Sequence, residues 1–199
     1  MKKIIINFAV IMCITLMFVS CSTPVGITSW KNPQSNAQVG NVVVLALFDK
    51  LTYSQPFELQ LATYFNSQNL KSQASQNFMD PTKQYTNTEL NSKLDSVGAD
   101  GLLLFSYKGS NVAINTTGGG FYGGYRGWYG GGGQVWTTTT VNVSAKLYIV
   151  KNDQLIWTAD MQLTDPSDVN ASALQIAKAI IKDWAAKNML KNPLPAPQK

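Results

Sequence analysis

Histidine is absent from this chain of 199 residues, and its absence excludes several classes of catalytic site. A Ser-His-Asp or Cys-His arrangement needs an imidazole as its general base. With no histidine and only two cysteines, the chain also lacks the usual ligands of a zinc site. The phosphate-binding pattern GxxxxGK[ST] is missing too. The sequence therefore predicts no enzyme, no cofactor and no metal.

The two cysteines, Cys13 and Cys21, lie near the amino end in a segment with the pattern of an export signal. Two lysines precede an apolar stretch at 4–19, and the signal segment closes with Phe18-Val19-Ser20-Cys21. This resembles a bacterial lipoprotein signal peptide (residues 1–20) with Cys21 as the lipid attachment site, although leucine is commoner than Phe18 in that pattern. The alternative is an uncleaved membrane anchor, for which the stretch is short. Cleavage would remove Cys13 and leave no partner for a disulfide.

Charge is scarce, at 14% of residues, and this argues against a nucleic-acid partner. Of 16 basic residues, Lys2 and Lys3 leave with the signal, so 14 remain against 11 acidic residues, a net charge of +3. We expect instead a membrane, reached through the lipid on Cys21, and an envelope protein or glycan. Ser22 resembles outer-membrane sorting in enteric bacteria, which places the chain in the bacterial cell envelope, on the outer membrane and facing the periplasm.

The most regular part of the sequence, residues 101–163, predicts a long hairpin followed by one more strand. Residues 134–150 alternate between apolar and polar side chains, as in a strand with one buried and one exposed face. Residues 155–163 repeat this alternation, and 101–117 supply the first strand of the hairpin. The pattern is typical of antiparallel pairing.

The hairpin has a glycine-rich tip at 118–133, in which ten of the sixteen residues are glycine. Glycine loses much conformational entropy on ordering, so a fixed fold of the isolated tip is not expected. Aromatic side chains on such a loop can stack on sugars or proteins, or rest at a membrane interface. The tip is a candidate interaction loop, with a passive connector as the equal alternative; its side chains of interest are Phe121, Tyr122, Tyr125, Arg126, Trp128 and Tyr129.

The remaining pattern completes an α/β (α+β) fold with the element order β-α-β-α-β-β-β-α. An apolar run at 42–48 predicts a central strand covered on both faces. Thr86 and Glu89 form a capping box at a helix start, and a last helix spans 169–187. Right-handed crossovers give parallel pairs. We predict one mixed five-stranded sheet with strand order 2-1-3-4-5; a ferredoxin-like α+β sandwich is the alternative.

These elements divide the chain into four parts. After the signal peptide at 1–20, a lipid-anchored linker spans 21–40, because its residues are mostly small and polar. A single α/β domain spans 41–190. A disordered tail follows at 191–199, where proline occupies alternate positions from 193 to 197.

The carboxyl ends of the central strands are a second candidate site, because α/β sheets hold ligands there. Asp49 and Lys50 follow the first strand, and Ser106, Tyr107 and Lys108 lie late on the third. A ligand-binding or hydrolytic domain would use these residues. The plainer interpretation is that Asp49 opens a solvated loop and Lys108 lies on the surface.

Five stretches occur here in the order seen in a family of small uncharacterised bacterial envelope lipoproteins with a Gly/Tyr-rich loop. None is specific by itself. The element order is also similar to the amino-terminal domain of the Tol-system periplasmic protein and to the α/β domain of the curli-export lipoprotein. The resemblance implies a non-enzymatic role in binding or assembly, with no catalytic residues to carry over. The stretches are SWKNP (29–33), VVVLAL (42–47), GADGLLL (98–104), the tip, and LIWTADMQLTDP (155–166).

Overall fold

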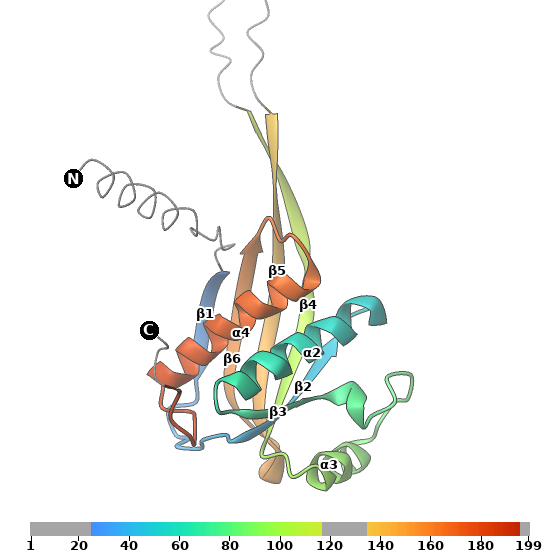
Figure 1. Cartoon of the computed structure of the whole chain (residues 1–199), viewed down its shortest axis with the longest axis vertical. Coiled ribbons are helices and arrows are strands. Elements are labelled where there is room, and N and C mark those ends of the chain that lie inside the picture. The colour runs from blue at the N-terminus through green and yellow to red at the C-terminus, as the bar shows by residue number, and fades with distance from the viewer. Residues whose placement is uncertain (1–24, 117–134, 196–199) are drawn as a thin grey trace, which may run out of the picture.

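The described residues form one mixed sheet with helices packed on its faces (Figure 1). The computed structural model describes residues 25–116 and 135–195. Within them the sheet has six strands in the order β1-β6-β5-β4-β2-β3. The elements are β1 (Val25–Lys31), β2 (Asn41–Leu47), α2 (Leu51–Ser67), β3 (Lys71–Ala74), α3 (Asn87–Ser96), β4 (Gly101–Thr116), β5 (Val135–Ile149), β6 (Gln154–Thr164) and α4 (Val169–Ala186).

The mixed α/β class predicted from the sequence is confirmed. β2 runs parallel to β3 and β4, with α2 and α3 as the crossovers, whereas β5 and β6 are added antiparallel. The capping box of α3 is present, because Thr86 Oγ1 accepts from the Glu89 N–H and the Glu89 carboxylate accepts from the Thr86 N–H. Gly98 stops that helix with a positive φ of 63°, which glycine adopts without strain.

The predicted five strands and the order 2-1-3-4-5 are wrong, because β1 adds a sixth strand at the edge. β1 pairs antiparallel with β6, from Val25 opposite Leu163 to Lys31 opposite Trp157. Its sequence signal is weak, since only Val25 and Ile27 contribute apolar side chains that pack against the core. The other five strands keep their predicted neighbours within the larger sheet.

Residues predicted as linker and tail also pack on the domain. Val39 is fully buried, and its N–H and C=O bond to Met189 and Lys191. Leu194 packs against the core as well. The described parts of both segments, 25–40 and 191–195, therefore belong to the folded unit rather than to a free linker and tail.

The main core lies between the sheet and the helix pair α2 and α4, which cover the same face (Figure 1). α3 packs on the opposite face, where Leu94 contacts a smaller cluster that includes Val43 and Leu102. The alternation along the strands sends neighbouring residues to the two faces. α2 follows β2, and α4 follows β6, so both helices begin at the same end of the sheet.

Beyond that end, β4 and β5 continue as a two-stranded ribbon (Figure 1). β2 pairs with β4 only as far as Ser106, and β6 pairs with β5 only as far as Thr140. Residues 112–116 and 135–139, which we call the β4–β5 ribbon, pair only with each other among the strands described. Five residues per strand extend the ribbon by roughly 17 Å. No helix in the described part of the chain is long and apolar enough to cross a membrane.

Candidate functional site

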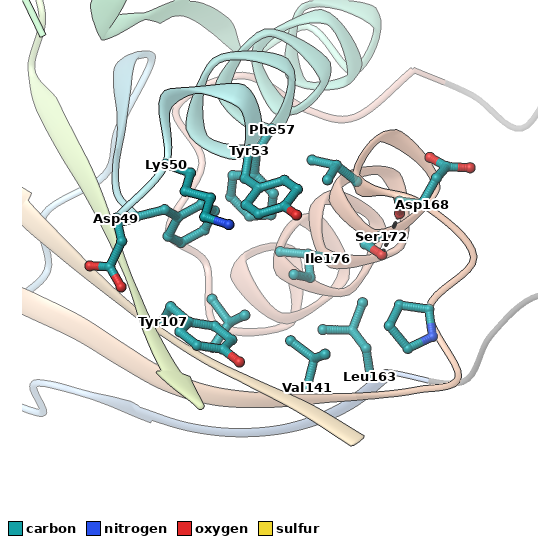
Figure 2. A pocket seen from close by; sticks show the side chains of 14 residues that line it. Asp49, Lys50, Tyr53, Phe57, Tyr107, Val141, Leu163, Asp168, Ser172 and Ile176 are labelled. Carbon is teal, nitrogen blue, oxygen red and sulfur yellow. Dashed lines mark hydrogen bonds between the residues drawn. The ribbon is translucent and has the colours of Figure 1, made fainter. Parts of the chain in front are cut away.

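A cavity of about 540 Å³ opens between the first turns of α2 and α4, at the end of the sheet where β2 and β6 finish. This volume is in the usual range of small-molecule sites. Its floor is formed by the strands and its walls by the two helices (Figure 2). The apolar lining consists of Phe48, Phe57, Val141, Val143, Leu163, Pro166, Val169 and Ile176.

Polar side chains lie at the rim of this cavity. Figure 2 shows the Lys50 ammonium turned toward the cavity and the Asp49 carboxylate turned away from it. Lys50 Nζ lies 5.9 Å from the centre of the Tyr53 ring. Asp168 caps α4 by accepting from the Ala171 N–H at 2.8 Å. The rim therefore presents one cationic side chain, Lys50, and two tyrosines, Tyr53 and Tyr107, to a ligand in the cavity.

The structure brings together only part of the strand-end site predicted from the sequence. Asp49 and Lys50 line the cavity, and so does Tyr107, which is about half exposed. Ser106 lies on the other face of the sheet. It comes four residues after Leu102, so both side chains point to the face that α3 covers, where Leu102 belongs to the smaller cluster. Lys108 is the extra residue where the β4–β5 register shifts, so it does not line the cavity.

The hydroxyl on the α4 wall of the cavity is already hydrogen-bonded to the backbone. Ser172, the hydroxyl on α4, donates to the Asp168 backbone carbonyl at 2.6 Å. An activated nucleophile needs a side-chain base within hydrogen-bond distance. Among the described lining residues no hydroxyl has such a bond, and no cluster of three His, Cys, Asp or Glu residues in the described ranges is placed to hold a metal.

At the other end of α4, a polar cluster around Asp183 was missed by sequence reasoning. The Asp183 carboxylate accepts from Trp157 Nε1 at 2.7 Å, from Ser29 Oγ at 2.9 Å and from Lys187 Nζ at 2.7 Å. Lys31 Nζ adds a bond to the Lys187 carbonyl at 2.9 Å. These hydrogen bonds connect β1 to α4. Only the i,i+4 spacing of Asp183 and Lys187 was visible in the sequence.

Glu58 of α2 is a buried carboxylate with a structural task. β3 pairs with β2 only as far as Val44, so the Ala46 N–H has no partner there. Glu58 accepts from that N–H at 2.8 Å and from Ser75 Oγ at 2.8 Å. Burial raises the pKa of Glu58 above 4.5, because desolvation of the charged form outweighs these hydrogen bonds.

Two predicted sites lie outside the described residues. These are the lipid attachment site Cys21 and the interaction loop of Phe121, Tyr122, Tyr125, Arg126, Trp128 and Tyr129. What the structure does give is the position of their neighbours, Val25 at the start of β1 and Thr116 and Val135 at the end of the ribbon.

Comparison with known proteins gives no family. No protein-family model matches the chain, and no curated protein matches it. The predicted membership of a lipoprotein family, and the likeness to the Tol-system and curli-export domains, remain predictions.

Solved structures show a distant likeness of fold. A PelC dodecamer from Paraburkholderia phytofirmans is 14% identical with a TM-score of 0.48, covering 85% of this chain and 100% of that one. Lipoprotein GNA1162 from Neisseria meningitidis is 10% identical with a TM-score of 0.42, covering 74% and 99%. A minor lipoprotein from Acinetobacter baumannii is 7% identical with a TM-score of 0.34, covering 78% and 98%. Two of these three structures are bacterial lipoproteins, and at these scores nothing of their roles is transferred to this chain.

Proposed function

We propose that this chain is a non-enzymatic lipoprotein of the bacterial envelope, anchored through Cys21, that binds a partner with the tip of its β4–β5 ribbon. The signal-like segment before Cys21 supports the anchor. The lining of the cavity, with its occupied Ser172 hydroxyl, favours binding over catalysis.

The observation that carries the proposal is that the start of β1, four residues after Cys21, and the ribbon share one end of the sheet. One row of paired residues crosses four neighbouring strands, and it consists of Val25 on β1, Leu163 on β6, Val141 on β5 and Ser110 on β4. Cys21 precedes Val25 by four residues, and the ribbon extends onward from the same row. The ribbon therefore points toward the membrane that the lipid enters.

This arrangement restricts the partner. The ribbon ends Thr116 and Val135 lie farther in this direction than the paired ends of β2 and β6. Five aromatic side chains and Arg126, without an acidic residue, suit stacking on a glycan or on an envelope protein near the bilayer. The outer membrane, facing the periplasm, is the proposed location, from Ser22 after the cysteine.

Replacement of residues 118–133 with Asn-Gly tests the role of the tip. Crosslinking in intact cells should lose the partners that the wild-type chain captures, and changing the five tip aromatics to serine should do likewise. Trp30→Ser is the matched control, because Trp30 is a half-exposed aromatic on β1. Unchanged partners in both tip variants would make the tip a passive connector.

The anchor is tested separately. Cys21→Ser should abolish fatty-acid labelling and leave an uncleaved precursor. Labelling that survives this change would contradict both the anchor and the envelope location.

The second candidate function is a ligand-binding domain that uses the cavity beside Asp49 and Lys50. The apolar lining favours it over the hydrolytic variant. Thermal shifts against a metabolite panel would separate it from a domain that acts only through its tip.

A further inference from the structure

The cavity between α2 and α4 is lined by hydrocarbon wherever it is deep. The polar lining side chains lie at the rim, and Ser172 already donates to the Asp168 carbonyl. A polar ligand would lose its hydrogen bonds to water without gaining partners from the deep wall. The wall therefore suits a hydrocarbon chain; its most buried members, each at most 5% exposed, are Phe57, Val143, Leu163 and Ile176.

The polypeptide enters the domain beside this cavity. Val25 is paired with Leu163, a lining residue, and both side chains pack on the helix-covered face. Adjacent strands are only about 4.8 Å apart. Cys21 lies four residues before Val25, and four extended residues span at most about 14 Å. A lipid on Cys21 therefore begins within reach of the cavity.

We infer that the cavity holds one acyl chain of the lipid attached to Cys21 of the same molecule. The inference rests on the proposed lipidation of Cys21. The acyl chain contacts the apolar wall, and the amphipathic rings of Tyr53 and Tyr107 at the rim face the polar linkage of the lipid. The other acyl chains enter the bilayer, so the ribbon end of the domain is held against the membrane surface.

A photoreactive fatty acid tests this inference in the full-length chain. Cells expressing the protein are fed a palmitate analogue with a diazirine near its methyl end and are then irradiated. The protein is digested with trypsin and analysed by mass spectrometry. We expect a crosslink that joins residues 21–31, through the lipid, to residues 152–178, 127–146 or 51–71, which carry the lining of α4 and β6, of β5 and of α2.

Each other result is decisive. Labelled Cys21 with crosslinks only to bilayer lipids overturns the inference and leaves the proposed lipoprotein intact. Absence of the label from residues 21–31 overturns both. A crosslink of free fatty acid to 152–178, without residues 21–31, assigns the cavity to a free amphiphile and overturns the inference.

Cavity-filling variants sharpen the test. Val141→Phe fills the cavity from β5, and both Val141 and Ser172 are half-buried lining residues. We expect the crosslink yield to fall at least tenfold while the labelling of Cys21 is unchanged. Leu47→Phe is the control, because Leu47 is 57% exposed and does not line this cavity. Ser172→Phe serves if Val141→Phe does not fold, and an undiminished crosslink in the folded variants overturns the inference.

Discussion

The two ends of the layer between α4 and the sheet differ, although the same elements form both. At the carboxyl end of α4, Trp184 packs on Trp157 with ring centres 5.5 Å apart and on Phe65 with centres 5.9 Å apart. At the amino end, the same helix borders the cavity beside Val141 and Leu163. We call the first the closed end and the second the open end.

This difference separates the part of the layer that stabilises the fold from the part that has room for a ligand. At the closed end two tryptophans are fully buried, and the Asp183 carboxylate satisfies the Trp157 N–H. At the open end the layer is widened by about 540 Å³ of unfilled space. Dense packing makes any lost side chain costly, whereas an existing cavity has little packing to lose. The closed end therefore stabilises the fold, and the open end is free to take a ligand.

Among the variants that compare the two ends, Trp184→Ala should cause the largest loss of stability. Trp184 is fully buried at the closed end, so its truncation should lower the free energy of unfolding by about 3–5 kcal/mol. Trp184→Phe is the control and should lose much less, because Trp184 Nε1 has no hydrogen-bond partner among the described residues. Urea unfolding measures both. A loss below about 1 kcal/mol for Trp184→Ala would mean that the closed end does not stabilise the fold.

Asp183→Ala should cause the next largest loss of stability. The change leaves Trp157 Nε1 without its acceptor inside the packed layer and removes the Ser29 hydrogen bond between β1 and α4. An unsatisfied buried donor costs about 1–3 kcal/mol. Asp160→Ala is the control, because Asp160 is an exposed carboxylate on the same strand as Trp157. Equal unfolding midpoints in urea for the two variants would show that the cluster is not stabilising.

Glu58→Gln tests the pH dependence of stability at α2, the helix beside α4 on the same face of the sheet. Because the pKa of Glu58 is raised in the folded state, its contribution to stability is full below about pH 4.5 and declines as pH rises through the raised value. The exposed Glu89 acts in the opposite sense, since its pKa is lowered to about 2 by Lys83 and the capping box. The wild type minus Glu58→Gln difference isolates Glu58. We expect urea unfolding from pH 4 to 8 to show that difference falling with rising pH, and a flat or rising difference would contradict the assignment.

Val141→Phe should change stability little at the open end. The added ring enters existing space, and an aromatic residue suits a strand, so we expect a shift within about 1 kcal/mol of zero. Thermal unfolding measures it. Val143→Phe is the comparison, because Val143 is only 5% exposed and a larger side chain there should be overpacked. A large loss for Val141→Phe would mean that the cavity is already filled by its neighbours.

What the sequence could predict depended on how local each signal was. The capping box of Thr86 and Glu89 and the positive φ of Gly98 are set by residues a few positions apart, and both were predictable. β1 was not, because Ser29 and Lys31 find their partners more than 150 residues away.

The candidate site shows the same limit. Asp49 and Lys50 could be placed at the strand end because they come two and three residues after the last residue of β2. Residues 101–105 are apolar on both faces of β4, so no alternation of polar and apolar residues separates Tyr107 from Ser106. The register shift beside Gly109 displaced Lys108 further. The cavity forms because two helices start at the same end of the sheet, and this tertiary arrangement cannot be predicted from the sequence of either helix alone.

Replacement of the tip should have the smallest effect on stability. β4 and β5 pair with each other as far as Thr116 opposite Val135. In the variant with Asn-Gly, the same register continues to a two-residue turn, and Asn-Gly is favoured in the turn type that such hairpins use. A shorter loop also costs less closure entropy, by about 0.6 kcal/mol for each halving. We expect thermal unfolding at or slightly above the wild-type temperature. Replacing the same residues with sixteen alternating Gly and Ser residues keeps the length, and it should match the wild type. A clear loss of stability in the Asn-Gly variant alone would show that the tip contacts the domain, and the ribbon could then not be treated as an independent arm beside the open end.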